Sequence, residues 1–120
     1  MALIVIPTGA MISCTHNPQN QVAATVSLSK DIIPIFTASC VLNSSCHLGA
    51  NGANQNIDLD SAQAYATIVA KGLVSTSDPQ SSLLYAEVQS DEMPKPPNTP
   101  LSASQQELIL NWIKQGALNN

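Results

Sequence analysis

Cys40-Val-Leu-Asn-Ser-Ser-Cys46-His47 carries more structural information than any other segment of this 120-residue chain. A histidine joined directly to the second of two nearby cysteines is typical of c-type haem attachment. The thiols add to the two vinyl groups of the porphyrin, and the imidazole lies under the iron as the proximal ligand. The usual spacing leaves two residues between the cysteines, whereas five separate them here. The segment therefore predicts one covalent haem c, with a longer loop between the thiols.

The longer spacing is compatible with attachment at both cysteines. One backbone step from Cys46 to His47 sets the second thioether and the imidazole together, and Cys40 needs only to reach the other vinyl group. Three additional residues, about 42–44, can loop outward, because modest loop lengthening costs on the order of 1 kcal/mol or less. The alternative is a single thioether at Cys46, with Cys40 present but unattached.

Upstream of this stretch, apolar residues at intervals of three and four predict a helix. Ser29 is its expected N-cap, and the helix is expected to begin near Lys30 or Asp31, so that Pro34 falls in the first turn where its missing N–H costs nothing. Cys40 would then leave the end of this helix on the side of the core. The helix thus places the first thiol.

Downstream, the pattern predicts three more short helices and no strand. One is expected to begin at Asp58 or Asp60 and to stop at Lys71-Gly72, and another has Asp78 as N-cap and Pro79 at its first position. The last begins at Ser102 with a capping box and ends at Lys114 to Gly116. Its apolar face consists of Leu108, Ile109, Trp112 and Ile113. We expect this last helix to pack on the first.

Two loops complete the expected surroundings of the haem. Residues 48–56 are rich in Gly, Ala and Asn, and Gly49 and Gly52 would let the backbone pass close to a flat ligand. Residues 91–100 hold four prolines in the seven positions from 94, which predicts a stiff loop. Met93 precedes the first of these prolines and lies 46 residues after His47. It is therefore the expected distal ligand of the iron; the alternatives are a core gap filler or His16 as the ligand.

The composition of residues 1–13 is typical of an export signal. Residues 1–13 carry no charge and include two apolar runs, too few for a transmembrane helix but enough for the core of a signal peptide. Cys14 follows as in a bacterial lipoprotein, so we expect it to be lipidated, with residues 14–28 as N-terminus and tether and 29–118 as the domain. The alternative is a buried free Cys14. The expected location is the periplasm or outer cell envelope, with a lipid anchor in the membrane.

The composition excludes some classes of function. Four Lys, no Arg and eight carboxylates give a net charge of −4, so no basic stripe exists for nucleic acid. Only one Phe, two Tyr and one Trp are available for a core. A large buried planar cofactor would supply the apolar area that so few aromatic side chains cannot. Two other interpretations of the cysteines stay open. These are a Cys40–Cys46 disulfide and a zinc site of Cys40, Cys46, His47 and either His16 or a carboxylate.

From about Ser29 to Leu118, the chain resembles the small bacterial class I monohaem cytochromes c. The motifs that carry the resemblance are Ile35-Phe36 through Cys40, Cys46-His47, Ser82-Leu83, Met93-Pro94, Leu101-Ser102, and Ile109 through Trp112-Ile113 to Gly116-Ala117. The resemblance implies an all-α fold of about four short helices in which the N- and C-terminal helices cross beside the haem. It also implies thioethers at Cys40 and Cys46, His47 as proximal ligand and Met93 as distal ligand.

Occupation of both axial positions would leave one-electron transfer as the remaining chemistry. We therefore expect an electron carrier, not an enzyme, which docks transiently with redox partner proteins; an open sixth position would instead suit a haem enzyme or gas sensor. Without arginine, Trp112, Lys71 and Lys95 are the candidate partners of the haem propionates. The competing interpretation is a haem-free, disulfide-stapled envelope lipoprotein that binds a partner.

Overall fold

The computed structural model of the chain describes residues 24–120. This part is all helical and contains no strand, as expected. Seven helical segments follow one another, namely η1 (Leu28–Ile32), α1 (Ile33–Ser39), η2 (Gly52–Asn54), α2 (Ala64–Ala70), η3 (Pro79–Ser81), α3 (Leu83–Gln89) and α4 (Ala103–Lys114). The signal peptide expected at residues 1–13, lipidation at Cys14 and the candidate ligand His16 lie outside the described residues.

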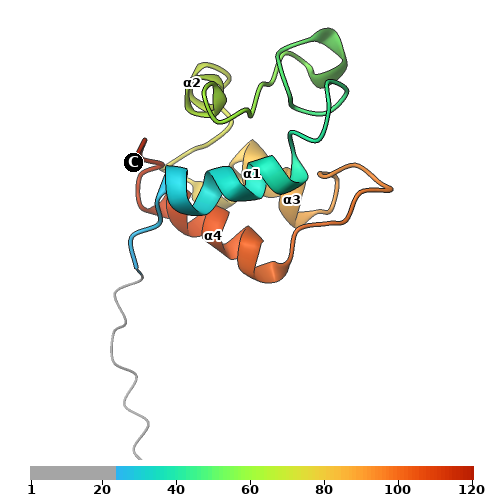
Figure 1. Cartoon of the computed structure of the whole chain (residues 1–120). Helices are drawn as coiled ribbons and strands as arrows, with labels where there is room; N and C mark the ends of the chain where they lie inside the picture. The colour runs from blue at the N-terminus through green and yellow to red at the C-terminus, as the bar shows by residue number, and fades with distance from the viewer. Residues whose placement is uncertain (1–23) are drawn as a thin grey trace, which may run out of the picture.

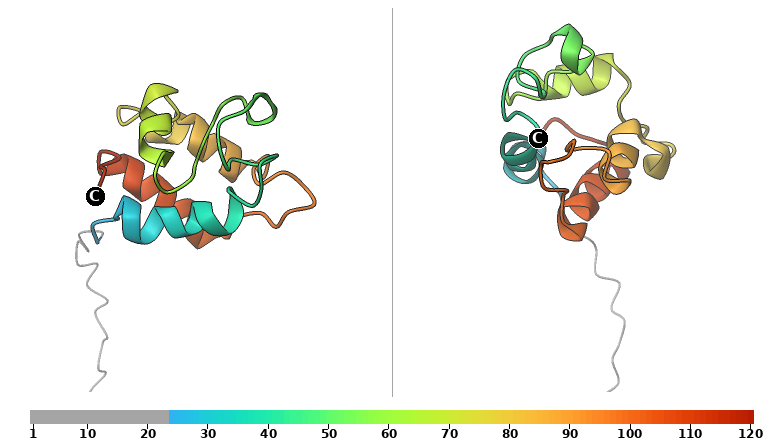
Figure 2. Two further views of the ribbon diagram at one scale, coloured as in Figure 1. Left: turned by 45° about the horizontal axis from the view of Figure 1, so that its top comes forward. Right: turned by 90° about the vertical axis from the view of Figure 1, so that its right-hand side faces the viewer.

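The longest helix, α4, lies at the centre of the packing. It contacts η1 near the start of the described residues, and it also contacts η3 and α3. The expected packing of the last helix on the first is therefore confirmed. Figure 1 shows α1 and α4 side by side, with α2 above them, and the second view in Figure 2 separates α2 from α4 by the other helices and loops.

The first helix begins earlier than predicted, and the N-cap at Ser29 was wrong. Ser27 is the N-cap, its side chain accepts the Lys30 N–H, and one wide turn of π-helix spans Leu28–Ile32. Pro34 therefore lies one turn later than predicted. It follows the π-turn and stands in the first turn of α1. A π-turn shifts the backbone hydrogen-bond register, and this shift lets a helical segment continue across a residue that cannot donate.

The second helix is shorter than predicted. It begins at Ala64, not at Asp58 or Asp60, because these aspartates serve the loop before it. Asp58 accepts hydrogen bonds from the backbone N–H groups of Gly49 and Asp60, and the Asp60 carbonyl accepts those of Gln63 and Ala64 in a turn. The end is as predicted, since Gly72 adopts φ of 61° directly after the C-cap.

The third predicted helix is split. Asp78 and Pro79 open only the 3₁₀ turn η3, and Asp78 makes no capping hydrogen bond through its side chain. Ser82 then takes an extended ψ of 130° before α3 begins at Leu83. The buried Ser82 hydroxyl accepts the Ser75 N–H at 2.8 Å and donates to the Ser75 carbonyl at 3.3 Å. These long-range bonds hold the break in place.

The last helix agrees with the prediction. Ser102 and Gln105 form the capping box, and each side chain accepts the backbone N–H of the other residue. Lys114 is the last helical residue, and Gly116 follows with φ of 106°. Of the predicted apolar face, Ile109, Trp112 and Ile113 are buried and Leu108 is half-buried.

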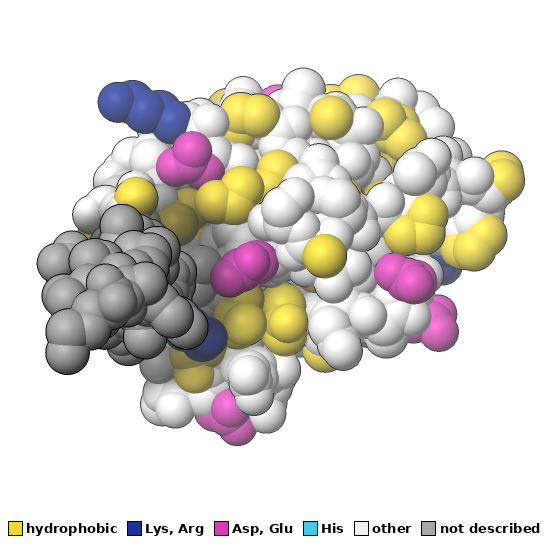
Figure 3. All heavy atoms as spheres, turned by 90° about the horizontal axis from the view of Figure 1, so that it is seen from below, with side chains coloured by type: hydrophobic (Ala, Val, Ile, Leu, Met, Phe, Trp, Pro, Cys, Tyr) yellow, Lys and Arg dark blue, Asp and Glu magenta, His cyan; other side chains and the backbone are white. Residues whose placement is uncertain are grey.

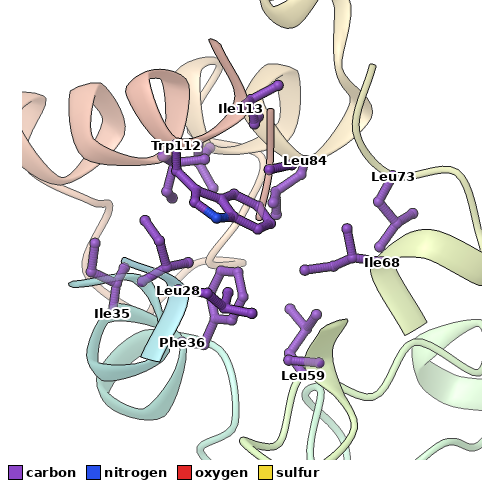
Figure 4. Packing of buried hydrophobic residues seen from close by; sticks show 14 of the residues in the cluster. Leu28, Ile35, Phe36, Leu59, Ile68, Leu73, Leu84, Trp112 and Ile113 are labelled. Atoms are coloured by element: carbon purple, nitrogen blue, oxygen red, sulfur yellow. The ribbon is translucent and has the colours of Figure 1, made fainter. Parts of the chain in front are cut away.

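The core forms where α1, α4 and α3 meet the segments around α2. Figure 4 shows Trp112 and Phe36 pointing into the same space, which Leu84 and Ile68 face from other elements. Val26 and Leu28 are also buried, so the packed part of the chain extends upstream of residue 29. This burial adds apolar area that the few aromatic residues alone would not supply.

The two ends of the described chain are joined by hydrogen bonds. The Gln115 side chain accepts the Val26 N–H at 2.8 Å and donates to the Ala24 carbonyl at 3.1 Å. The Asn120 side chain accepts the Leu28 N–H at 2.9 Å. The start of η1 is therefore held against the segment that follows α4.

Between residues 24 and 120, no helix combines the length and the apolar character that crossing a membrane requires. The face seen from below carries few charged side chains, which lie scattered among polar and apolar atoms (Figure 3). Charged side chains of one sign form no continuous patch on this face (Figure 3).

Candidate functional site

A cavity of about 280 Å³ brings together the four residues that the sequence singled out, Cys40, Cys46, His47 and Met93. These residues come from the end of α1, from the loop after it and from the proline-rich loop after α3. Leucines and other aliphatic side chains form much of the wall, namely Ile57, Leu59, Leu73, Leu83, Leu84 and Val88. The site is thus an apolar cavity with two thiols, one imidazole and one thioether at its surface.

The longer loop between the cysteines closes on itself. Cys40 is the C-cap of α1, as predicted, and its carbonyl accepts the His47 N–H at 2.9 Å. Within the loop, the Asn43 side chain accepts the N–H groups of Ser45 and Cys46 at 2.8 and 3.2 Å. The two ends of the loop therefore meet, and the intervening residues loop outward.

His47 is held at its backbone and at its ring. Its carbonyl accepts the Leu59 N–H at 2.9 Å, and its Nδ1 lies 3.0 Å from the carbonyl oxygen of Ile57. A carbonyl oxygen can only accept, so Nδ1 carries the proton in this hydrogen bond. In the neutral imidazole, Nε2 is then the nitrogen with a free lone pair. Metal-ligating histidines are commonly oriented by such a bond to the other nitrogen.

Met93 is half-buried and packs against the core. Its backbone N–H donates to the Glu87 carbonyl at 3.0 Å, which fixes the start of the loop against the end of α3. The following Pro94 is buried and also lines the cavity. The loop thus holds a thioether sulfur at the cavity without a helix or strand, as the proline content predicts.

Both cysteines of the site are free thiols in the structure. Burial raises the pKa of Cys40 from 9.0 to about 12, and the proximity of Cys46 adds to this effect. Cys40 therefore stays protonated through the neutral range. It is a poor nucleophile toward external reagents in this state.

The charged groups at the cavity are few. Lys95 and Glu87 are the cation and the anion among the lining residues. Two of the three residues suggested as partners of the haem propionates bind other groups. Trp112 donates its Nε1–H to the Leu118 carbonyl at 2.9 Å inside the core, and Lys71 Nζ lies 3.3 Å from the Gln55 carbonyl. Trp112 is therefore excluded as a carboxylate partner here, and Lys95 is the candidate cation at the cavity.

The glycines of loop 48–56 do not have the expected role. Gly49 and Gly52 are absent from the cavity lining, which this loop supplies through Ala53, Asn54 and Gln55. Gly49 is needed instead for its φ of 77°.

Asn54 was not foreseen as a site residue. It is buried and lines the same cavity as His47, and its side chain donates to the backbone carbonyls of Cys46 and Gly49. The available signal was the spacing of Asn51 and Asn54, which form an asparagine capping box around η2.

The residues present fit a covalently held haem in their chemistry. Two thiols, an imidazole with its Nδ1–H already bonded, a thioether sulfur and an apolar wall match the donor set and surroundings of such a group. No three His, Cys, Asp or Glu side chains of residues 24–120 gather as a metal-ion cluster. Comparisons with known protein families, with curated proteins and with solved structures found no match.

Proposed function

We propose that this chain is a one-electron carrier with one covalently attached c-type haem, exported to the bacterial cell envelope. Cys40 and Cys46 form the thioethers, His47 is the proximal ligand and Met93 the distal ligand. The observation that supports the proposal is that all four side chains line one cavity although they span 54 positions of sequence. The resemblance to small class I cytochromes c gives the same assignment.

The volume of the cavity indicates how much of a haem it could enclose. A volume of about 280 Å³ is just below the range of about 300–1,000 Å³ for small-molecule sites. A planar group as large as a porphyrin would thus keep one edge outside the wall, or the loops would move apart. An edge in solvent is what transient electron exchange with a partner requires.

Each residue has a defined task in this proposal. Cys40 and Cys46 would hold the haem through thioethers, each formed by addition of S–H across a vinyl C=C, with sulfur on one carbon, hydrogen on the other and no leaving group. His47 offers Nε2 while the Ile57 carbonyl holds its Nδ1–H, and Met93 offers its sulfur from a fixed loop. The bound haem supplies reversible one-electron chemistry at iron. If His47 and Met93 both bind the iron, the chain would offer electron transfer and no free metal site for a substrate.

Lys95 would offset the negative charge of the propionates. The Lys95→Met variant should therefore have a lower midpoint potential, because a nearby positive charge favours the reduced form. Lys71→Met is the matched control, since Lys71 is not among the residues lining the cavity. An unchanged potential in Lys95→Met would remove Lys95 from this role.

An absorption spectrum of the full chain, exported to the periplasm of a host with haem-attachment machinery, tests the cofactor. A Soret band that stays with the protein after acidic organic extraction is expected, since both thioethers are covalent. Haem that is extracted would contradict covalent attachment. Absence of the band would leave the haem-free envelope lipoprotein as the better interpretation.

The distal ligand is tested by Met93→Ala. We expect loss of the charge-transfer absorption of Met-ligated ferric haem and a lower midpoint potential, because Met ligation favours the reduced state. Leu83→Ala is the control, since Leu83 lines the same cavity, is 50 % exposed and has no ligating atom. An unchanged spectrum in Met93→Ala would show that another group occupies this position.

A further inference from the structure

Asn54 is one of two buried polar residues among positions 24–120, the other being Ser82. It is 5 % exposed and lines the cavity. Its Nδ2 donates to the Cys46 carbonyl at 2.7 Å and to the Gly49 carbonyl at 2.6 Å. Its Oδ1 accepts the Asn51 N–H at 3.0 Å. Both amide protons of this side chain are therefore used to bind the loop that carries the imidazole.

The backbone of Asn54 binds Ile57, the residue whose carbonyl contacts the imidazole. Its carbonyl accepts the Ile57 N–H at 3.0 Å, and the Ile57 carbonyl in turn lies 3.0 Å from His47 Nδ1. The Cys46 carbonyl that the side chain binds belongs to the peptide bond leading into His47. One residue thus connects the peptide before the histidine to the segment that holds its ring.

Asn51 and Asn43 extend this arrangement to the loop between the cysteines. Asn51 donates to the Ser44 carbonyl at 2.7 Å, and Asn43 accepts the Cys46 N–H. A spacing of two residues would leave little freedom between the thiols, whereas five residues need additional bonds to fix their conformation. The three asparagines supply such bonds.

We propose that Asn54 is a positioning residue that fixes the ring of His47, with Nδ1 protonated and Nε2 available. The identity of the ligand at Nε2 rests on the proposed function. The positioning itself does not, because every bond named above lies within the polypeptide. The two can therefore be tested separately.

Asn54→Asp is the sharpest variant, because it keeps the shape of the side chain and replaces both donors by an oxygen facing two carbonyls. We expect hydrogen exchange of His47 Nδ1–H in the full chain to become about tenfold faster, the equivalent of about one lost hydrogen bond. The measurement uses NMR in a His16→Gln background, which leaves one histidine. The Asn56→Asp variant adds the same charge at an exposed position two residues away and should exchange as the parent does.

The Ser82→Ala variant is the control for a general loss of stability, because it removes the other buried polar group. That variant should unfold more easily but leave the His47 exchange rate unchanged under native conditions. Asn54→Ser provides a milder change, since its hydroxyl is too short to reach both carbonyls, and it serves where Asn54→Asp does not accumulate. A smaller acceleration is expected for it.

In the haem-loaded protein, the same variants should shift the midpoint potential and the ferric electron paramagnetic resonance spectrum, which respond to the orientation and basicity of the proximal imidazole. Parental exchange rates in both Asn54→Asp and Asn54→Ser would overturn the proposal. If the parent chain carries no haem, the proposed function fails, but the exchange measurement still decides whether Asn54 positions His47.

Discussion

Cys40 illustrates how its surroundings determine the chemistry of one side chain. The thiol lies at the end of α1, half-buried against the core and beside the second cysteine. Both conditions disfavour the thiolate, and together they raise its pKa to about 12. The sequence identifies this cysteine but not its reactivity, because the desolvation comes from residues distant in the chain.

In the haem-free chain, Cys40 should react slowly with iodoacetamide. At pH 8, a pKa of about 12 in place of 9.0 leaves about a thousandth of the thiolate that an unperturbed cysteine carries. The rate in the native protein should keep rising with pH well above pH 9, whereas in urea it should level off about one pH unit above the ordinary pKa of 9.0. Peptide mass spectrometry of Cys40 measures both profiles. Equal rates with and without urea would contradict the burial of this thiol.

The hydrogen-bond partner of the His47 ring could not be predicted from the sequence. The fused Cys46-His47 pair suggested the ligand, and a metal ligand needs a bond at its other nitrogen. The acceptor turned out to be a backbone carbonyl, that of Ile57. Every residue type has such a carbonyl, so no side-chain pattern identifies it. The role of Asn54 could not be predicted for the same reason, because its partners are also backbone carbonyls.

At the scale of elements, some local signals predicted helix ends correctly, although the N-cap at Asp78 was not among them. The capping box of Ser102 and the stop at Gly72 depend on bonds within one turn, and both were predicted. The extended residue Ser82 and the early start at Ser27 were not. Ser82 is held by Ser75 across a loop, and the start of η1 is held by the end of the chain. Tertiary contacts thus set these boundaries.

Deletion of residues 42–44 tests whether the loop between the cysteines only bridges its ends. It restores a spacing of two residues and removes Asn43. Because the His47 N–H already bonds to the Cys40 carbonyl, we expect the haem-loaded variant to accumulate at least as well as the parent, with unchanged absorption bands. The measurement is the haem-to-protein ratio after export. Loss of attachment would mean that the longer loop is itself required.

At the scale of the whole molecule, the fold depends on contacts between the two ends of the described chain. Gln115 makes two of the bonds that hold residues 24–26 beside α4. Such pairings join positions about 90 residues apart, and hydrophobic periodicity carries no information about them. The sequence could therefore indicate that the first and last helices pack, but not how far the packed region extends upstream.

Gln115→Ala should destabilise the protein by about 0.5–1.5 kcal/mol, because the part-buried Val26 N–H loses its partner while water can replace the exposed bond to Ala24. Urea unfolding followed by circular dichroism measures this difference. Lys114→Ala is the neighbouring control, since Lys114 is exposed, and it should change the stability by about 0.5 kcal/mol or less. A variant as stable as the parent would show that the ends contribute little to folding.

The continuous helix of η1 and α1 also separates two ends of the molecule. The described chain enters at Ala24 beside the start of η1, while Cys40 lies twelve helical residues further on, roughly 18 Å away along the axis. Figure 1 shows the entering segment and the loop after α1 at opposite ends of this helix. If Cys14 carries a lipid, as we expect, the lipidated segment joins the described domain at the end of this helix that is remote from Cys40.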